Sequence, residues 1–323
     1  MQGMILAAGL GSRLHPLTLF RAKPAIPFLN RPLICHAADF LRRLPLSELI
    51  VNLHHLPDSV ISALGEAAPR VHYSPEESLL GTAGAVGRVR ARLSADPFVV
   101  CNGKIYFEED PRQVVGFHRD RGAIATLVLV PQSGEQRFRP VRVNRAGEVV
   151  GFGQVGQSEE ELESYTFTGV QVLSQRALDF IPEGPSDLVD DLYLGLIREG
   201  YPVLGFVSRA RWCECSTPER YLRKSLELLD SRGQDCLAGS SLDEDACHRS
   251  VVGQGVEVSP GSNLKQCVVW DDVRIGPACS LSNAIIVSGV HLPMQTNLSD
   301  VIITPARHPE TDQTDYRLWP LRT

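Results

Sequence analysis

The stretch LAAGLGSRLHPLTLFRAKPAIPFLNRPL (residues 6–33) lies near the start of the chain and combines small residues, prolines and basic side chains. A short apolar strand is expected to run into it. The loop that follows holds Gly9, Gly11 and Ser12, whose backbone amides can close on phosphate oxygens. Arg13 adds a fork-shaped donor that suits a polyphosphate. The stretch therefore predicts an anion site at the carboxyl end of a strand, where open α/β sheets bind their ligands.

Two common phosphate motifs do not fit this stretch. A dinucleotide fingerprint needs G-x-G-x-x-G leading into a helix, but the third glycine is absent and Pro16 interrupts. A Walker loop needs GK followed by Ser or Thr, which occurs nowhere in the chain. Lys23 follows instead, and Pro24 fixes the backbone beside it. The stretch indicates a phosphate site of another type.

Outward from this stretch, apolar segments of strand length alternate with amphipathic segments of helix length. The expected strands are 3–9, 48–55, 70–75, 97–103 and 124–130, and the expected helices are 32–44, 56–67, 81–93 and 111–122. This alternation predicts a mostly parallel sheet that is covered on both faces.

The pattern changes after Pro131. We expect a hairpin at 140–153 with its turn at 144–147, strands at 165–174, 202–208 and 211–216, and helices at 186–200 and 217–233. The last helix has Thr217 as N-cap, Pro218 at its first position and Gly233 as its stop.

The end of the chain has a third pattern, in which aliphatic residues recur every six positions. They are Val252, Val258 and Leu264, then Val269, Ile275, Leu281 and Val287, then Leu292 and Leu298. This period predicts a short hexapeptide parallel β-helix, with an ordinary small β-domain as the alternative. We therefore predict two domains, an α/β domain at 1–233 and the repeat domain with its tail at 234–323.

Composition narrows the function. The 323 residues carry a net charge of −6 without long runs of one sign, which argues against a nucleic-acid partner. We expect no membrane association, because we find no charged-then-apolar leader and no spanning apolar run. The eight cysteines include no CxxC pair, which favours reduced thiols and a cytoplasmic location. A metal at Cys213 and Cys215 would need a matching pair elsewhere, and there is none.

Five motifs follow one another along the chain. The first is G-x-G-x-R with L-x-P-L-T and K-P in 9–24, and the others are ESLLGTAGAV (77–86), N-G-x-I (102–105), FTGVQVL (167–173) and W-x-E-x-x-TPERYL (212–222). In this order they resemble the sugar-1-phosphate nucleotidyltransferases, and in particular the bacterial mannose-1-phosphate guanylyltransferase-like group. The resemblance covers nearly the whole chain, because members of this family often end in a left-handed β-helix.

The resemblance implies a fold and a reaction. The fold would be an α/β, Rossmann-like nucleotidyltransferase domain with a mixed sheet, followed by a short left-handed parallel β-helix. A sugar 1-phosphate would attack the α-phosphorus of a nucleoside triphosphate in line, releasing pyrophosphate and leaving a nucleotide sugar. No protein nucleophile is needed, so the protein supplies positioning and charge neutralisation. GTP and mannose 1-phosphate are the favoured pair, and a homo-oligomer formed through the β-helix is a further expectation.

The resemblance also assigns residues. Those expected to bind the nucleotide are Leu6, Ala7, Ala8, Gly9, Gly11, Ser12, Gly81, Thr82, Asn102 and Gly103, and those expected beside the sugar are Thr168 and Gly169. Gly11 and Arg13 would hold the β- and γ-phosphates. Lys23 would bridge the α-phosphate and the attacking phosphate.

One position departs from the family. In PFVVCNGKIYFEED (97–110), Lys104 stands where the family has an aspartate that binds Mg²⁺. The second metal ligand would come from Glu214, and the family's Glu-Lys-Pro segment is replaced by VVGFGQVGQ (149–157). Lys104 would then neutralise phosphate directly, or Mg²⁺ would shift to Glu214 and Glu108, or nucleotide would be bound without turnover.

Several functions therefore stay open at this point. The main alternative to an enzyme is a non-catalytic, regulatory nucleotide-sugar binder. A UTP- or dTTP-dependent hexose-1-phosphate transferase is a second alternative. Hexapeptide repeats alone would suggest an acyltransferase, but the repeats are few.

Overall fold

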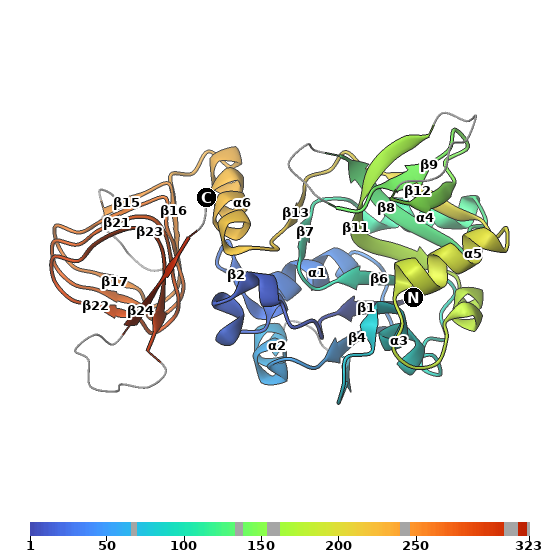
Figure 1. The fold of residues 1–323 in the computed structure, drawn as a ribbon, viewed down its shortest axis with the longest axis horizontal. Coiled ribbons are helices and arrows are strands. Elements are labelled where there is room, and N and C mark those ends of the chain that lie inside the picture. Colours follow the sequence, from blue (N-terminus) through green and yellow to red (C-terminus); the bar gives the residue numbers. More distant parts are fainter. Residues whose placement is uncertain (66–69, 133–137, 154–161, 240–245, 307–315, 322–323) are drawn as a thin grey trace. The chain divides into compact units, whose positions relative to one another are not determined.

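The structure is a computed structural model, and it describes residues 1–65, 70–132, 138–153, 162–239, 246–306 and 316–321 (Figure 1). The chain forms two compact units. The first consists of Met1–Gly9 and Leu33–Cys213, and the second of Leu10–Pro32 and Glu214–Thr323. The second unit therefore joins two distant pieces of sequence. The domain boundary predicted after residue 233 stays a prediction.

A nine-stranded mixed sheet forms the centre of the first unit, in the order β10-β9-β11-β6-β1-β4-β5 with β8 beside β11 and β12 beside β8. Its strands are β1 (Gln2–Leu6), β4 (Glu48–Leu53), β5 (Val71–Pro75), β6 (Phe98–Asn102), β8 (Ala125–Pro131), β9 (Val141–Val143), β10 (Val149–Phe152), β11 (Glu163–Leu173) and β12 (Val203–Val207). β1, β4, β5 and β6 are parallel, whereas β11 runs antiparallel to β6. The mixed α/β sheet is confirmed.

Helices cover this sheet. They are α1 (Leu33–Arg42), α2 (Pro57–Leu64), α3 (Gly81–Arg88), α4 (Pro111–Asp120) and α5 (Leu194–Arg198), with a 3₁₀ segment η5 at Gln175–Phe180. A separate two-stranded sheet pairs β7 (Ile105–Phe107) with β13 (Trp212–Glu214). The helix expected at 186–200 is instead a π-helix, η6 (Leu188–Tyr193), that runs into α5. Asp187 begins it by accepting hydrogen bonds from the amides of Val189 and Asp190.

The N-terminal piece of the second unit is built from tight turns. Three 3₁₀ turns, η1 (Ser12–Leu14), η2 (Leu17–Leu19) and η3 (Lys23–Ala25), lead into a hairpin of β2 (Pro27–Phe28) and β3 (Arg31–Pro32). The later piece begins with α6 (Pro218–Ser231), where the Thr217 hydroxyl accepts from the Arg220 amide. The predicted cap, the proline and the stop at Gly233 (φ 66°) are all confirmed.

The C-terminal strands stack in parallel as successive coils (Figure 1). They are β14 (Cys236–Ala238), β15 (Cys247–His248), β16 (Ser250–Val252), β17 (Glu257–Val258), β18 (Asn263–Lys265), β19 (Val268–Val269), β20 (Arg274–Ile275), β21 (Ser280–Ile286), β22 (His291–Leu292), β23 (Asn297–Pro305) and β24 (Tyr316–Pro320). Their aliphatic side chains, from Val252 to Ile303, form a core of their own. The parallel hexapeptide stack is confirmed.

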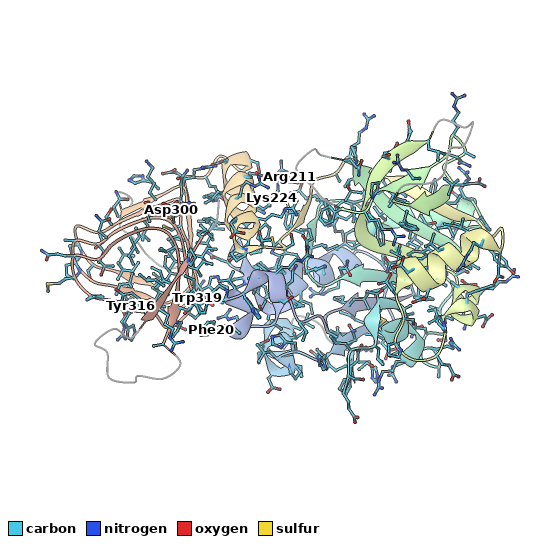
Figure 2. The ribbon with its side chains drawn as sticks, viewed as in Figure 1. Phe20, Arg211, Lys224, Asp300, Tyr316 and Trp319 are labelled. Atoms are coloured by element: carbon cyan, nitrogen blue, oxygen red, sulfur yellow. A yellow bond between two sulfur atoms is a disulfide. The ribbon has the colours of Figure 1, made fainter. Side chains whose placement is uncertain are left out.

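Two details of the stack differ from a simple repeat. Serine hydroxyls accept from amides 17 residues further on, as Ser250 does from Cys267 and Ser262 from Cys279, so a coil has 17 residues and not 18. The last strand, β24, is antiparallel to β23. Figure 2 labels Tyr316 and Trp319 on this strand, and the Trp319 indole donates to the Thr304 hydroxyl at 3.1 Å.

The prediction that all eight thiols are reduced is wrong in this structure, because Cys236 and Cys247 form a disulfide. The first coils of the stack bring their Cα atoms to 6.0 Å, which is within the range that a disulfide spans. Sequence spacing could not indicate this pair, since it depends on how the coils turn. The other six cysteines are buried and are not disulfide-bonded.

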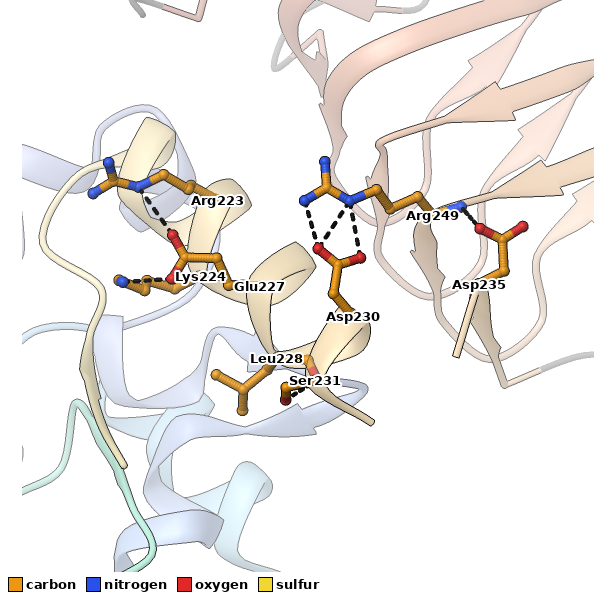
Figure 3. A network of polar contacts seen from close by, with 8 residues as sticks. All are labelled: Arg223, Lys224, Glu227, Leu228, Asp230, Ser231, Asp235 and Arg249. Carbon is orange, nitrogen blue, oxygen red and sulfur yellow. Dashed lines mark hydrogen bonds and ion pairs between the residues drawn. The ribbon is translucent and has the colours of Figure 1, made fainter. Parts of the chain in front are cut away.

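α6 is fastened to the stack by an ion pair at its end (Figure 3). The Arg249 guanidinium donates to both carboxylate oxygens of Asp230, and the Arg249 amide donates to Asp235. The guanidinium holds the pKa of the Asp230 carboxyl below its usual value. Along α6, Glu227 pairs with Arg223 and Lys224 on the same helix face.

Within the described ranges, no helix has the length and apolar character needed to cross a bilayer.

Candidate active site

The carboxyl ends of β1 and β6 bring together the first group of predicted nucleotide residues. Leu6 pairs with Asn102 in the parallel register, and the Gly103 amide donates to the Leu6 carbonyl at 2.9 Å. Ala7 and Ala8 are buried, whereas Gly9 is exposed where the chain leaves this unit. The strand tips therefore offer backbone groups and an amide side chain, as expected of a ligand site at this edge.

Two residues that the sequence analysis did not assign connect this edge to α3. The side-chain oxygen Oδ1 of Asn52 accepts from the Ala7 backbone amide at 2.7 Å, and the side-chain nitrogen Nδ2 of Asn52 donates to Oε1 of Glu76 at 2.7 Å. The second Glu76 oxygen accepts from the Leu80 amide at 3.1 Å, next to the start of α3. Both polar side chains are about 95% buried. The sequence signal that could have pointed to this link was Asn52, a polar residue near the end of the apolar run 49–53.

Gly81 and Thr82 begin α3, as predicted, but Thr82 already has partners in the protein. Gly81 has a φ of 73°, and a Cβ there would run into the Ser186 carbonyl oxygen. The Thr82 hydroxyl donates to Asp187 at 2.9 Å and accepts from the Leu188 amide at 2.8 Å. Thr82 therefore joins α3 to the π-helix, and its predicted contact with a base or ribose stays a prediction.

The two residues predicted beside the sugar lie in the irregular middle of β11, but they differ in accessibility to a ligand. The Thr168 hydroxyl is buried and donates to the Val128 carbonyl at 2.8 Å, which supports the strand. Gly169 has a φ of 83° and lies against the amide of Asn102, with no room for a Cβ. Gly169 thus adjoins the strand tips, whereas the Thr168 side chain is used in the fold.

Lys104 follows β6 in the turn to β7 and is half-buried. It belongs to the first unit together with Asn102 and Gly169. Its position directly after the tip of a central strand agrees with the expectation from the sequence.

The second unit holds the remaining candidates. Gly11 has a φ of 65°, and a Cβ there would lie 2.8 Å from the Thr18 methyl group and 3.0 Å from Cβ of Lys23. The Thr18 hydroxyl donates to the Gly11 carbonyl at 3.1 Å. Ser12 and Arg13 are exposed in η1. The structure therefore packs the glycine loop directly on the Lys23 stem and leaves the Arg13 guanidinium accessible.

Lys23 and Glu214 form an ion pair in this unit, with 3.0 Å between Nζ and Oε1. Only 8% and 5% of their side-chain surfaces are exposed. Lys23 is therefore a buried, charge-paired residue and not a solvated surface lysine. Glu214, predicted as a metal ligand, instead contacts the ammonium group.

These residues do not fit a magnesium site of the family type. Lys104 brings an ammonium group to the position where the family has a carboxylate, and Glu214 contacts Lys23. Among the residues that the structure describes, no three or more His, Cys, Asp or Glu side chains are grouped as metal ligands would be.

Comparison with models of known protein families shows which family the chain belongs to. A family model described as nucleotidyl transferase matches residues 2–231, and a second model, described as a GlmU-like C-terminal hexapeptide, matches residues 235–301. The chain belongs to the nucleotidyl transferase family. The resemblance that the five motifs predicted is confirmed.

Individual relatives agree on the family and differ in substrate. A mannose-1-phosphate guanylyltransferase from Mycobacterium tuberculosis is 27% identical over 84% of this chain and 80% of its own length. A UTP–glucose-1-phosphate uridylyltransferase from Synechocystis is also 27% identical, over 84% of this chain and 71% of its own length. The crystal structure of HddC from Yersinia pseudotuberculosis has a TM-score of 0.60 at 21% identity and covers 70% of this chain and 99% of its own. That last likeness shows the fold alone.

Proposed function

We propose that the chain transfers a nucleotidyl group from a nucleoside triphosphate to a sugar 1-phosphate, giving a nucleotide sugar and pyrophosphate. A non-bridging oxygen of the sugar phosphate attacks the α-phosphorus in line, and the bond from the α-phosphorus to the bridging oxygen of pyrophosphate breaks. The observation that carries the proposal is the buried Lys23 ammonium beneath the Gly11 loop. A cation held in a nearly closed site stabilises charge on phosphate more strongly than one in water.

The proposal gives each group of predicted residues a role. The tips of β1 and β6 and the start of α3 bind the nucleoside, and Gly169 lies on the sugar side. Gly11 and Arg13 bind the β- and γ-phosphates, and Lys23 bridges the α-phosphate and the attacking phosphate. Lys23 must exchange Glu214 for phosphate as the substrates arrive.

GTP and mannose 1-phosphate are the proposed substrates. The relative from Mycobacterium tuberculosis supports them by its name, but the uridylyltransferase from Synechocystis matches at the same identity. UTP or dTTP with another hexose 1-phosphate is therefore the competing assignment within the same reaction. A cytoplasmic location is part of this proposal, although the Cys236–Cys247 disulfide removes the argument from reduced thiols.

A second candidate function is a non-catalytic nucleotide-sugar binder, and Lys104 favours it. An ammonium group cannot ligate a metal. Lys104 is therefore compatible with a protein that binds a nucleotide sugar and no longer catalyses a metal-dependent reaction. Lys104 at the strand tip would then neutralise phosphate in the bound nucleotide.

A substrate panel distinguishes these functions. Each of GTP, UTP, dTTP and ATP is combined with mannose 1-phosphate or glucose 1-phosphate, with Mg²⁺ and with chelator, and released pyrophosphate is measured. We expect release with GTP and mannose 1-phosphate. Binding of nucleotide sugar in calorimetry without release from any pair would establish the non-catalytic binder instead.

A further inference from the structure

The segment that carries Gly11, Arg13 and Lys23 is attached to the hexapeptide stack on both sides of Lys23. Arg21 provides the first attachment, two residues before Lys23. Its guanidinium donates to Asp271 at 3.3 Å and to Ser288 at 3.0 Å. It also lies over the Trp270 ring, 5.3 Å from the centroid. One guanidinium thus engages side chains that follow β19 and β21, two neighbouring strands of the stack.

Asn30 provides the second attachment, at the turn of the β2–β3 hairpin. Leu29 and Asn30 have φ values of 52° and 60°, a conformation that asparagine tolerates better than most residues. The Asn30 side-chain amide donates to the Val252 carbonyl at 2.7 Å and the Leu237 carbonyl at 3.2 Å. These carbonyls belong to the paired strands β16 and β14, so the two hydrogens of one amide group bridge two coils.

A buried chain of hydrogen bonds lies between these attachments. The Trp270 indole donates to the Tyr221 hydroxyl at 3.1 Å, and that hydroxyl donates to the Pro27 carbonyl at 2.5 Å. Trp270 and Tyr221 are at most 1% exposed. Tyr221 lies on α6, which packs against β16 and β21. Its ring also contacts Phe28, with 6.4 Å between ring centroids.

Both members of the Lys23–Glu214 pair therefore depend on the same support. Lys23 is held through Arg21 on one side and through the 27–30 hairpin on the other. Glu214 precedes Thr217, the cap of α6, and α6 is bound to the stack by Tyr221 and Asp230. A displacement of the stack would move the Lys23 ammonium, the group that the proposed function places on the α-phosphate.

We infer that the hexapeptide stack holds the segment 10–32, which carries Gly11, Arg13 and Lys23 and is here called the phosphate loop, and that Arg21 and Asn30 are positioning residues that act through Lys23. The inference rests on the proposed function for its effect on turnover. The repeat region would then position a residue of the candidate site, in addition to its predicted role in forming a homo-oligomer. Reactions that depend on orientation lose about a hundredfold in rate for displacements near 1 Å, so a loosened loop should be visible in kcat.

The test uses the full chain and four variants. Arg21→Met keeps the hydrocarbon stem and removes both donated bonds, and Arg21→Lys restores the charge facing Asp271. Asn30→Asp keeps the size of the side chain but replaces the donating amide with a carboxylate oxygen, which cannot donate to the two carbonyls. Arg274→Met is the matched control, because its pairing with Glu257 is in the same stack with 65% and 70% of the side chains exposed.

We expect Arg21→Met and Asn30→Asp to lower kcat at least tenfold with KM for the sugar phosphate changed less than threefold. Arg21→Lys should recover part of kcat, and Arg274→Met should match wild type. Hydrogen exchange of the Leu14 and Ile26 amides, which bond inside the segment, should accelerate in the first two variants only. Exchange of the β4 amides in the first unit should not change.

The outcomes separate this inference from the proposed function. Unchanged exchange at Leu14 and Ile26 would show that the stack does not hold the loop. Faster exchange with kcat within twofold of wild type would show that Lys23 does not depend on it. If the wild type releases no pyrophosphate with any pair, the proposed function fails and triphosphate affinity becomes the second readout. A tenfold weaker affinity in both variants then supports the holding role, and equal affinity overturns it.

Discussion

Lys23 and Glu214 each keep the other's charge compensated in a site almost closed to water. Removing one partner of such a pair leaves a buried charge, which costs roughly 3 kcal/mol of folding free energy. We expect Lys23→Met to lower the free energy of unfolding, and Lys23→Met with Glu214→Gln to recover most of it. Pyrophosphate release should stay about a hundredfold below wild type in both variants. Denaturant titration and the release assay measure the two quantities, and a double variant that regains turnover would reduce Lys23 to a structural role.

Lys104 differs from the aspartate expected at its position by two units of charge. At about 4 Å and an effective dielectric near 20, each unit is worth roughly 4 kcal/mol beside a phosphate. We expect wild-type nucleotide affinity to change little on chelation of Mg²⁺ and to weaken with salt. Lys104→Asp should bind nucleotide only when Mg²⁺ is present, because a carboxylate repels triphosphate until a cation bridges them. Calorimetric titrations of both proteins with and without chelator provide the measurement. Equal stimulation of the two by Mg²⁺ contradicts a charge-replacing role.

At the scale of elements, His118 couples the packing of α4 on the sheet to pH. Its ring Nδ1 lies 2.9 Å from the Thr126 hydroxyl of β8. Burial lowers the pKa of His118 to about 4, assisted by Arg119 and opposed by Asp96. The unfolded chain takes up this proton near pH 6.5 and the native chain only near pH 4. Stability that is complete above pH 6.5 is therefore lost as the pH falls.

We expect this loss to be of the order of 3 kcal/mol between pH 6.5 and pH 4. His118→Gln, which has no such proton, should show a flatter dependence over the same range. Urea unfolding at pH 7, 5.5 and 4.5 measures the slope for both proteins. Parallel slopes would mean that His118 is not responsible.

Elements with strong local signals could be predicted from the sequence. Thr217, Pro218 and Gly233 mark the ends of α6 by cap and turn chemistry that acts within a few residues. The six-residue period indicated the stack, because most of its aliphatic residues, such as Val252, Ile275 and Leu292, enter the same interior. The 17-residue coil and the π-helix at 188–193 carry no comparable local signal. They follow from packing between residues distant in sequence.

The candidate site also contains some features that could be predicted from the sequence and others that could not. The Gly11 loop was predictable because a glycine must occupy its positive φ beside Lys23. The Asn52–Glu76 link was not, because it joins the ends of two strands through side chains 24 residues apart. The partner of Lys23 was missed for the same reason, since Glu214 lies 191 residues away. Glu214 was assigned to a metal by resemblance, whereas the fold places it on an ammonium group.

At the scale of the whole molecule, the chain divides by contacts and not by order along the sequence. The first unit has its own buried core, which includes Met4, Phe98 and Leu127. The segment 10–32 leaves that unit and joins the C-terminal piece. A cut between the nucleotidyl transferase match and the hexapeptide match would therefore separate the segment 10–32 from the stack residues that hold Arg21 and Asn30.

We expect a chain that ends after Gly233 to keep the sheet of the first unit and to lose pyrophosphate release. It lacks Asp271, Ser288 and the Val252 carbonyl, which hold Arg21 and Asn30. Its α6 also loses β16 and β21, so an apolar helix face becomes exposed. A chain that ends after residue 306 is the control, because it loses β24 and keeps these partners.

Hydrogen exchange, sedimentation and the release assay distinguish the two truncations. In the shorter chain, the amides of β1 and β6 should stay protected while those of Leu14 and Ile26 lose protection. Its sedimentation should differ from that of the full chain, either because an assembly surface of the stack is gone or because exposed α6 associates. The longer chain should match wild type in exchange and release, since the supports of Lys23 remain. Full protection at Leu14 and Ile26 together with wild-type release in the shorter chain would make the stack dispensable to the site, because that chain lacks the partners of Arg21 and Asn30.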